Sequence, residues 1–173
     1  MALIKDRALA EDSWQKIDDG TPVPADGGAI VSLERWIAER AALAGRNAPI
    51  GVLLEADTPP GNLVENIDRL DLIAVPFDHF KDGRGYSIAR LLRGRFGFTG
   101  ELRAVGNVLR DQLAFLERCG FDSFEYEGRT AAIDALKAFD EIGVVYQAAA
   151  DRRQSAAAVR NHPSRAFVNG TSG

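Results

Sequence analysis

Between residues 50 and 147, short apolar segments alternate with longer amphipathic segments, and this alternation restricts the fold more than any other feature. The strand-like segments are 50–54, 72–77, 101–105, 121–126 and 144–147. The segments between them place apolar residues at helical spacing and are 59–70, 86–96, 107–120 and 128–143. Such alternation is typical of βαβ units. The sequence therefore predicts an α/β fold of repeated βα units with a mainly parallel sheet.

The length of the chain leaves two architectures open. A complete (β/α)₈ barrel usually needs about 200 residues or more, whereas this chain has 173 residues and four or five strand–helix steps. An open doubly wound sheet fits, and so does a half-barrel that completes itself as a homo-oligomer. We predict a single α/β domain over residues 1–150, with an irregular segment over 1–30, and a mobile tail over 151–173.

Before the regular pattern, two stretches carry local signals. The opening segment could form short strands or a hairpin with Trp14 as an anchor, and residues 21–28 have the prolines and glycines of turns. After it, apolar residues at helical spacing follow Ser32 and stop at Gly45. Serine is a favoured N-cap and glycine a favoured helix terminator, so we expect a helix between them.

The charge and the apolar stretches exclude several classes of protein. With a net charge of −4 and a pI of about 5.2, the chain is not expected to bind nucleic acid or anionic membranes. Its apolar runs are too short to span a bilayer, and the first residues are acidic where a signal peptide would be apolar. We therefore expect a cytoplasmic protein.

Potential metal ligands are scarce. Cys119 is the only cysteine, and the two histidines, His79 and His162, lie far apart in the chain. An iron–sulfur cluster, a structural zinc site or a CxxC redox pair cannot be built from so few ligands. We predict no metal and no cofactor. Cys119 ends a helical pattern, which favours a buried small hydrophobe over a reactive thiol.

The loops at the carboxyl ends of the predicted strands share one edge of the sheet, where ligands of parallel α/β folds bind. The loop after strand 72–77 is the longest and the richest in functional groups. Its glycines can adopt positive φ and expose N–H groups at a helix start, and its cations can contact an anion. The candidate anion-binding residues are Lys81, Gly83, Arg84, Gly85, Asn107 and Arg110.

The same loop offers acid–base groups, and it also has a purely structural interpretation. Asp78, His79 and Asp82 are the candidate proton-transfer groups. Alternatively, the glycines serve a tight turn and Ser87 caps a helix, since the loop matches neither a Walker A nor a GxGxxG pattern. Arg103 lies in a predicted strand and needs a partner if it is buried.

Several long segments resemble a bacterial family that is commonly encoded beside assimilatory sulfite reductase and described as probable oxidoreductases of sulfite reduction. The likeness extends to about residue 150 and is carried by residues 4–15, 22–27, 80–93, 100–126 and 144–151. One departure is visible, because the family usually has an aspartate where this chain has Asn107. An amide cannot act as a base near neutral pH.

The resemblance implies an accessory protein of sulfite reduction and sulfur assimilation, with sulfite reductase as the partner. A single cysteine cannot hold the siroheme–iron–sulfur centre of that reductase, and no flavin or nicotinamide fingerprint is present. The chain would therefore support the reductase rather than carry its redox centre. The alternative is a small-molecule enzyme or a binding protein for a phosphate- or sulfur-oxyanion ligand at the carboxyl ends of the strands.

Overall fold

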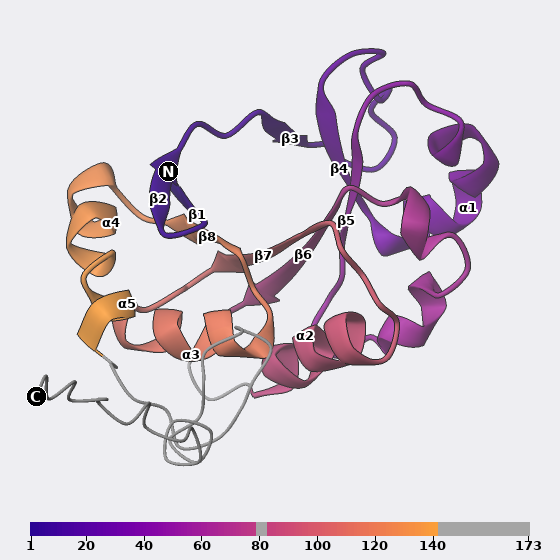
Figure 1. Ribbon diagram of the computed structural model, residues 1–173. Helices are drawn as coiled ribbons and strands as arrows, with labels where there is room; N and C mark the ends of the chain where they lie inside the picture. Colours follow the sequence, from indigo (N-terminus) through magenta and orange to yellow (C-terminus); the bar gives the residue numbers. More distant parts are fainter. Residues whose placement is uncertain (79–82, 142–173) are drawn as a thin grey trace, which may run out of the picture.

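The computed structural model describes residues 1–78 and 83–141, which form a curled sheet with helices around its outer face (Figure 1). The strands are β1 (Ala2–Lys5), β2 (Ala8–Ala10), β3 (Trp14–Lys16), β4 (Gly28–Ser32), β5 (Ile50–Leu53), β6 (Leu72–Phe77), β7 (Glu101–Gly106) and β8 (Ser123–Tyr126). The α-helices are α1 (Leu33–Ala44), α2 (Arg84–Gly94), α3 (Leu113–Cys119), α4 (Arg129–Ala135) and α5 (Ala138–Glu141). Short 3₁₀ helices are η1 (Pro60–Leu63), η2 (Ile67–Arg69) and η3 (Arg110–Gln112).

The strand order explains the curvature. Within the described residues the order is β2-β1-β8-β7-β6-β5-β4-β3, and β3 to β8 are parallel and adjacent in chain order. Right-handed crossovers between successive neighbours place all the connecting helices on one face. The prediction of a mostly parallel α/β sheet is confirmed, and the half-barrel replaces the open doubly wound alternative. The hairpin strand β1 is the exception, since it pairs antiparallel with β2 and β8.

The first thirty residues differ from the irregular segment that was predicted. They supply β1, β2, β3 and most of β4, and the β1–β2 turn contains Asp6 and Arg7 at positive φ. Strands of three to five residues are too short to show a reliable alternation in sequence, which is why short strands or a hairpin were expected here without definite bounds. The expected hairpin is present, although it precedes Trp14, which begins β3.

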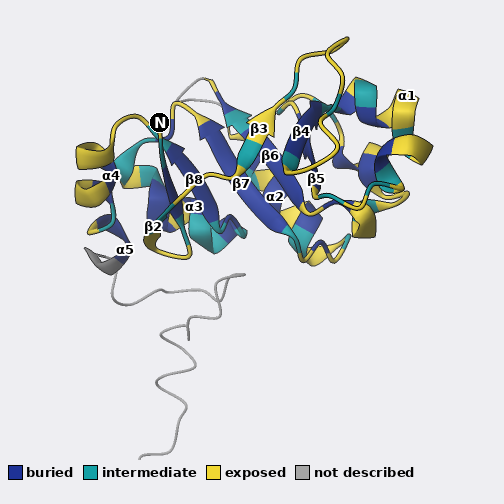
Figure 2. Ribbon diagram, turned by 90° about the horizontal axis from the view of Figure 1, so that it is seen from above, coloured by how far each residue is buried: buried dark blue, intermediate teal, exposed yellow. Residues whose placement is uncertain are grey.

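The edge strands β2 and β3 are separated by residues 11–13 only, which we call the strap. Four extended residue steps cover at most about 14 Å, whereas the edges of a flat sheet of this many strands would lie about 34 Å apart. The sheet must therefore curl until its edges approach each other. The strap crosses the open, concave side of the sheet (Figures 1 and 2).

The helices agree with the predictions in part. Ser32 caps α1, because its Oγ accepts a hydrogen bond from the backbone N–H of Arg35 at 3.1 Å. The helix predicted over 59–70 is replaced by η1 and η2, since Asn66 between them has a φ of 69°. The helix predicted over 107–120 begins only at η3 and continues as α3. The predicted strand 144–147 and the predicted tail lie outside the described residues.

The main core lies between the sheet and the helices, as the buried colour of the central strands indicates (Figure 2). Trp36 of α1, Phe121 and Phe124 are almost fully inaccessible there. Cys119 is buried in the same core, and burial raises the pKa of its thiol, which confirms the expected small hydrophobe. Among the described helices, none has the length and apolar character needed to cross a membrane.

Candidate functional site

Within residues 1–78 and 83–141, three pockets open along the inner face and the carboxyl edge of the sheet. The largest, the carboxyl-end pocket, has a volume of about 570 Å³ and is lined by Met1, Gly106, Asn107, Val108, Leu109, Tyr126 and Glu127. A second pocket of about 230 Å³ lies at the ends of β3, β4 and β5. The third, the hairpin pocket, has about 270 Å³ and lies beside β1 and β2. The carboxyl-end pocket occupies the place where parallel α/β folds bind ligands.

Gly106 shapes the carboxyl-end pocket. Its φ of 87° turns the chain away from β7, so that the next N–H, that of Asn107, donates to the carbonyl oxygen of Phe77 at 3.0 Å. A Cβ at Gly106 would stand 3.4 Å from Oδ1 of Asp78. The Asp78 carboxylate therefore lies against the backbone that carries Asn107. The structure thus brings together two candidates, Asp78 and Asn107, from the ends of neighbouring strands.

A second carboxylate, Glu55 at the end of β5, lies near Asp78. Burial raises the pKa of Glu55, and the negative charges of Asp78, Asp57 and Glu34 raise it further. A carboxyl group with a raised pKa at this edge can exchange a proton closer to neutral pH. The position of Glu55 after a predicted strand follows from the sequence, whereas its proximity to Asp78 depends on the β5–β6 pairing.

The two glycines of the predicted anion loop do not adopt positive φ; in the described residues that conformation occurs at Gly106 and Gly128 of this edge. Gly85 is buried, and a Cβ there would lie 2.6 Å from Cζ of Phe77. Close packing against an aromatic ring therefore explains this glycine. Gly83 precedes α2 in open space, with a φ of −80°.

The remaining candidates are distributed as follows. Arg84 is the first residue of α2 and is exposed. Arg110 lies on η3, and its Nε stands 3.5 Å from Oδ2 of Asp134 on α4. His79, Lys81 and Asp82 lie outside the described residues. Of the predicted anion-binding set, Asn107 is the residue that lines the carboxyl-end pocket.

A buried ionic network fills the concave side of the sheet. The side chain of Arg103 is 1% exposed, and its guanidinium contacts Glu101 at 2.8 Å and Asp12 of the strap at 2.9 Å. Glu125 of β8 lies 3.7 Å from the same guanidinium. The expectation that Arg103 needs partners is met. The Glu-x-Arg spacing in a strand indicated that Glu101 and Arg103 share a face, whereas Asp12 and Glu125 arrive through the topology.

Two lysines complete this network. Nζ of Lys5 donates to Glu101 at 2.7 Å, and Nζ of Lys16 donates to Glu125 at 3.4 Å. Burial opposes ionisation of Glu101, but the hydrogen bond from Lys5 and the charge of Arg103 outweigh it and hold the pKa of Glu101 below its usual range. Three cations therefore face three carboxylates on the concave side.

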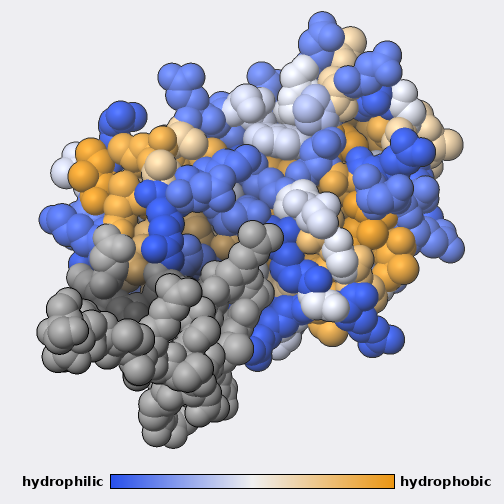
Figure 3. Space-filling view, viewed as in Figure 1, coloured by the Kyte–Doolittle hydropathy of each residue, from blue (hydrophilic) through white to orange (hydrophobic). Residues whose placement is uncertain are grey.

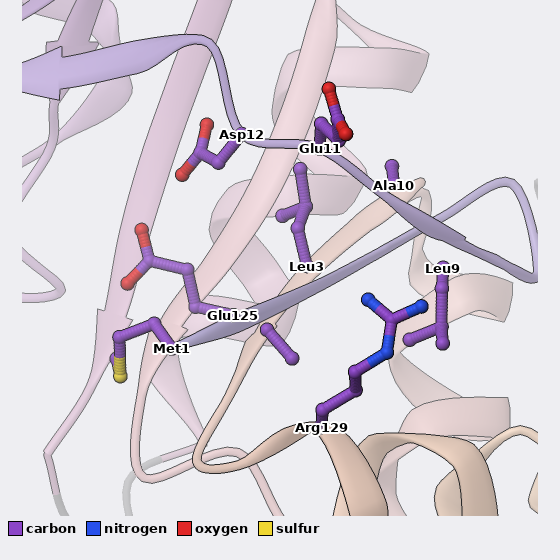
Figure 4. A pocket seen from close by; sticks show the side chains of 9 residues that line it. Met1, Leu3, Leu9, Ala10, Glu11, Asp12, Glu125 and Arg129 are labelled. Carbon is purple, nitrogen blue, oxygen red and sulfur yellow. The ribbon is translucent and has the colours of Figure 1, made fainter.

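The hairpin pocket lies against this network. Its lining comprises Met1, Ala2, Leu3, Leu9, Ala10, Glu11, Asp12, Glu125 and Arg129. Figure 4 shows the Arg129 guanidinium on one side of Leu3 and the carboxylates of Asp12 and Glu125 on the other. No cluster of three or more histidine, cysteine or acidic side chains suited to a metal ion occurs in the part of the chain that the structure describes.

Comparison with known protein families shows to which family this chain belongs. Residues 51–157 match the model of a bacterial protein family of unknown function, DUF934. The chain belongs to this family. The DUF934 match begins in β5 and includes Asp78, Asn107 and the rest of the carboxyl edge from β5 to β8, while β1 to β4 precede it. No curated protein matches the chain. Since DUF934 is described without an activity, the link to sulfite reduction is a proposal.

Proposed function

We propose that this protein binds a small oxyanion of sulfur or phosphorus at the carboxyl-end pocket and supports sulfite reduction as an accessory of sulfite reductase. The observation that carries the proposal is the pocket of about 570 Å³ at the ends of β7 and β8, with Asn107 in its wall. This is the edge where (βα) proteins bind phosphorylated and other anionic ligands. The sulfur chemistry rests on the family resemblance of residues 80–93 and 100–126.

Two side chains of the pocket wall, Asn107 and Tyr126, are suited to hydrogen bonding with an oxyanion rather than to proton transfer. Asn107 offers an amide N–H donor to an oxyanion but cannot take a proton near neutral pH. Burial raises the pKa of Tyr126, so its hydroxyl stays a neutral hydrogen-bond donor. Arg84 begins α2 at the end of the loop that follows the neighbouring strand β6, and its planar guanidinium suits an oxyanion.

A titration tests the binding. Isothermal calorimetry of the full chain with sulfite, sulfate and inorganic phosphate should give saturable binding of at least one anion. Asn107→Ala and Arg84→Ala should each weaken it by about tenfold, the loss of one charge-assisted or pocket hydrogen bond. Arg95→Ala is the matched control, because Arg95 is exposed just beyond the opposite end of α2. Equal affinity in all four proteins, or no binding at all, contradicts the proposal.

The supporting role needs a surface for the reductase, and the outer face of α2 and α3 has a suitable composition. Leu91 and Phe115 are 37% and 51% exposed there. Arg84 and Arg90 of α2 are exposed, and residues 84–94 contain no acidic residue, although the chain as a whole has a net charge of −4. An exposed apolar and basic surface of this kind fits an acidic protein partner.

Co-purification tests this surface. Tagged wild-type protein should retain sulfite reductase from a lysate of the source bacterium, and Phe115→Asp should lose it. Apolar side chains also gather over α4, where Ile133 is 49% exposed (Figure 3), so Ile133→Asp serves as a control with the same chemical change. Loss in both variants, or in neither, argues against a partner on α2 and α3.

A second function, acid–base catalysis on a small molecule, is favoured by the pair Glu55 and Asp78. The raised pKa of Glu55 is the property expected of a general acid or base. NMR titration of the Glu55 carboxyl should give a pKa above that of an ordinary glutamate. It should fall in Asp78→Asn, because the variant removes a neighbouring negative charge. An unchanged pKa in the variant would remove the electrostatic basis of this function.

A further inference from the structure

The hairpin pocket is distinct from the carboxyl-end pocket, although Met1 lines both. It lies between the β1–β2 hairpin, the strap and β8, and Leu3, Leu9 and Ala10 form an apolar wall. Its volume of about 270 Å³ is close to the lower end of the range of about 300–1,000 Å³ that is usual for small-molecule sites. The pocket is therefore matched in size to a small metabolite.

The polar groups of this pocket stand at two ends. Arg129 provides the cationic end, and among the described residues it has no hydrogen-bond or ion-pair partner of its own. Asp12 and Glu125 provide the acidic end, on the other side of Leu3 (Figure 4). A ligand that satisfied both ends would carry an anionic group and a cationic group, with an apolar part between or beside them.

The carboxylates of Asp12 and Glu125 can accept a further hydrogen bond from a ligand. Each carboxylate has about four acceptor positions. Among the residues that the structure describes, Glu125 is approached by Lys16 at 3.4 Å and by Arg103 at 3.7 Å, both long distances for a charged pair. Asp12 accepts from the backbone N–H of Trp14 at Oδ1 and from Arg103 at Oδ2. One ammonium group can therefore be added without displacing the existing network.

The charge balance favours a ligand with no net charge. The three cations Lys5, Lys16 and Arg103 are matched by Glu101, Asp12 and Glu125. Among the side chains that line the pocket, the remaining charges are Arg129 and Glu11, again one of each sign. A dianion or a dication would leave one end of the pocket unmatched, whereas a zwitterion pairs with both.

We propose that the hairpin pocket binds a small zwitterion of the α-amino acid class, with its carboxylate at Arg129, its ammonium at Asp12 and Glu125, and an apolar side chain on Leu3 and Leu9. This proposal is independent of the oxyanion site, because the two pockets use different polar side chains. It assigns a function to the N-terminal hairpin and the strap, which lie before the matched DUF934 span.

Calorimetric titration with L-leucine and L-methionine tests the proposal, together with blocked forms of each. The free amino acids should bind, and the N-acetyl derivatives and the amides, which lack the ammonium and the carboxylate respectively, should bind about tenfold more weakly or not at all. In Arg129→Gln the preference for the free acid over the amide should disappear. Arg129 is exposed, so the variant is expected to fold, and a thermal melt checks this.

Lys137→Gln is the control, because Lys137 is an exposed cation that lies outside the pocket lining. It should keep the wild-type affinity and the wild-type preference. The proposal is overturned if neither amino acid binds to the wild-type chain, or if the blocked forms bind as tightly as the free acids. It is also overturned if Arg129→Gln retains the preference while folding normally.

Discussion

Asp12 and Arg103 lie 91 residues apart in the chain, yet Nη1 of Arg103 donates to Oδ2 of Asp12 at 2.9 Å. This contact fastens the strap to β7, a central strand of the eight-stranded sheet, across the concave side of the half-barrel. Because the Arg103 side chain is almost fully buried, its charge is compensated by protein groups alone. The Asp12–Arg103 contact therefore links the strap to the part of the chain that matches DUF934.

Arg103→Met should lower the free energy of unfolding by about 3–5 kcal/mol, because it leaves buried carboxylates without their shared cation. Urea denaturation followed by circular dichroism measures this. Lys137→Met removes an exposed ion pair with Asp134 and should leave the free energy of unfolding close to the wild-type value. A loss in Arg103→Met as small as that of the control would mean that the network contributes little to stability.

The stability contributed by Glu101 should depend on pH. Its pKa in the folded chain is below the ordinary value of 4.5, so its stabilisation is fully present above that value and is lost as the pH falls through the folded pKa. The difference in free energy of unfolding between wild type and Glu101→Gln should therefore be largest at neutral pH and shrink below about pH 4.5. Denaturation curves from pH 7 to pH 3 check this, and a constant difference would contradict it.

The pKa of Asp122 is shifted in the opposite direction from that of Glu101, so Asp122 serves as an internal comparison. Burial raises its pKa above 3.8, although the charge of Arg93, whose Nη2 donates to it at 2.6 Å, acts against the shift. As the pH falls through this range, the folded chain takes up the proton more readily than the unfolded chain, which favours folding. The wild-type advantage over Asp122→Asn should therefore not shrink on acidification in the way that it does for Glu101→Gln.

Gly85→Ala should be destabilising by about 1–3 kcal/mol, because the new Cβ would stand 2.6 Å from the ring of Phe77. Gly94→Ala on the same helix meets nothing within 4 Å and should be neutral or slightly stabilising. Thermal melts of both variants measure the difference. Equal melting temperatures would show that the Phe77 ring moves aside freely. Close packing against Phe77 would then no longer explain the glycine at position 85.

Asn107→Asp should weaken oxyanion binding by about tenfold, since it places a negative charge in the wall of the carboxyl-end pocket. The sequence resemblance implies an aspartate at this position, so the same variant tests whether this chain has diverged in what it binds. Calorimetry with sulfite and phosphate measures the change. Stronger anion binding in Asn107→Asp would contradict the proposed role of the amide.

The sequence was informative where a pattern is local and strong. The run 72–77 coincides with β6, and the rule of carboxyl ends correctly placed Asp78 beside Asn107. Prediction from the sequence failed where a structure depends on one backbone conformation. The positive φ of Asn66, which interrupts the helix predicted over 59–70, is an example. Prediction from the sequence also failed for contacts between residues that lie far apart in the chain.

The partners of Arg103 illustrate the second kind of failure. Asp12 reaches it because the strap crosses a curled sheet, and the curvature follows from strand order, which periodicity does not contain. The packing of Gly85 against Phe77 is similar, since two glycines in a loop look alike whether they approach a ligand or a ring. The hairpin pocket could not be anticipated because three of its walls come from short strands.

The central claim, that this protein supports sulfite reduction through the carboxyl-end pocket, is tested most directly by growth of a deletion strain of the source bacterium. We expect the deletion strain to grow slowly with sulfate or sulfite as the sole sulfur source and normally with cysteine. The wild-type gene should restore growth, and a folded Asn107→Ala variant should not. Growth of the deletion strain on sulfate and sulfite at the wild-type rate would contradict it.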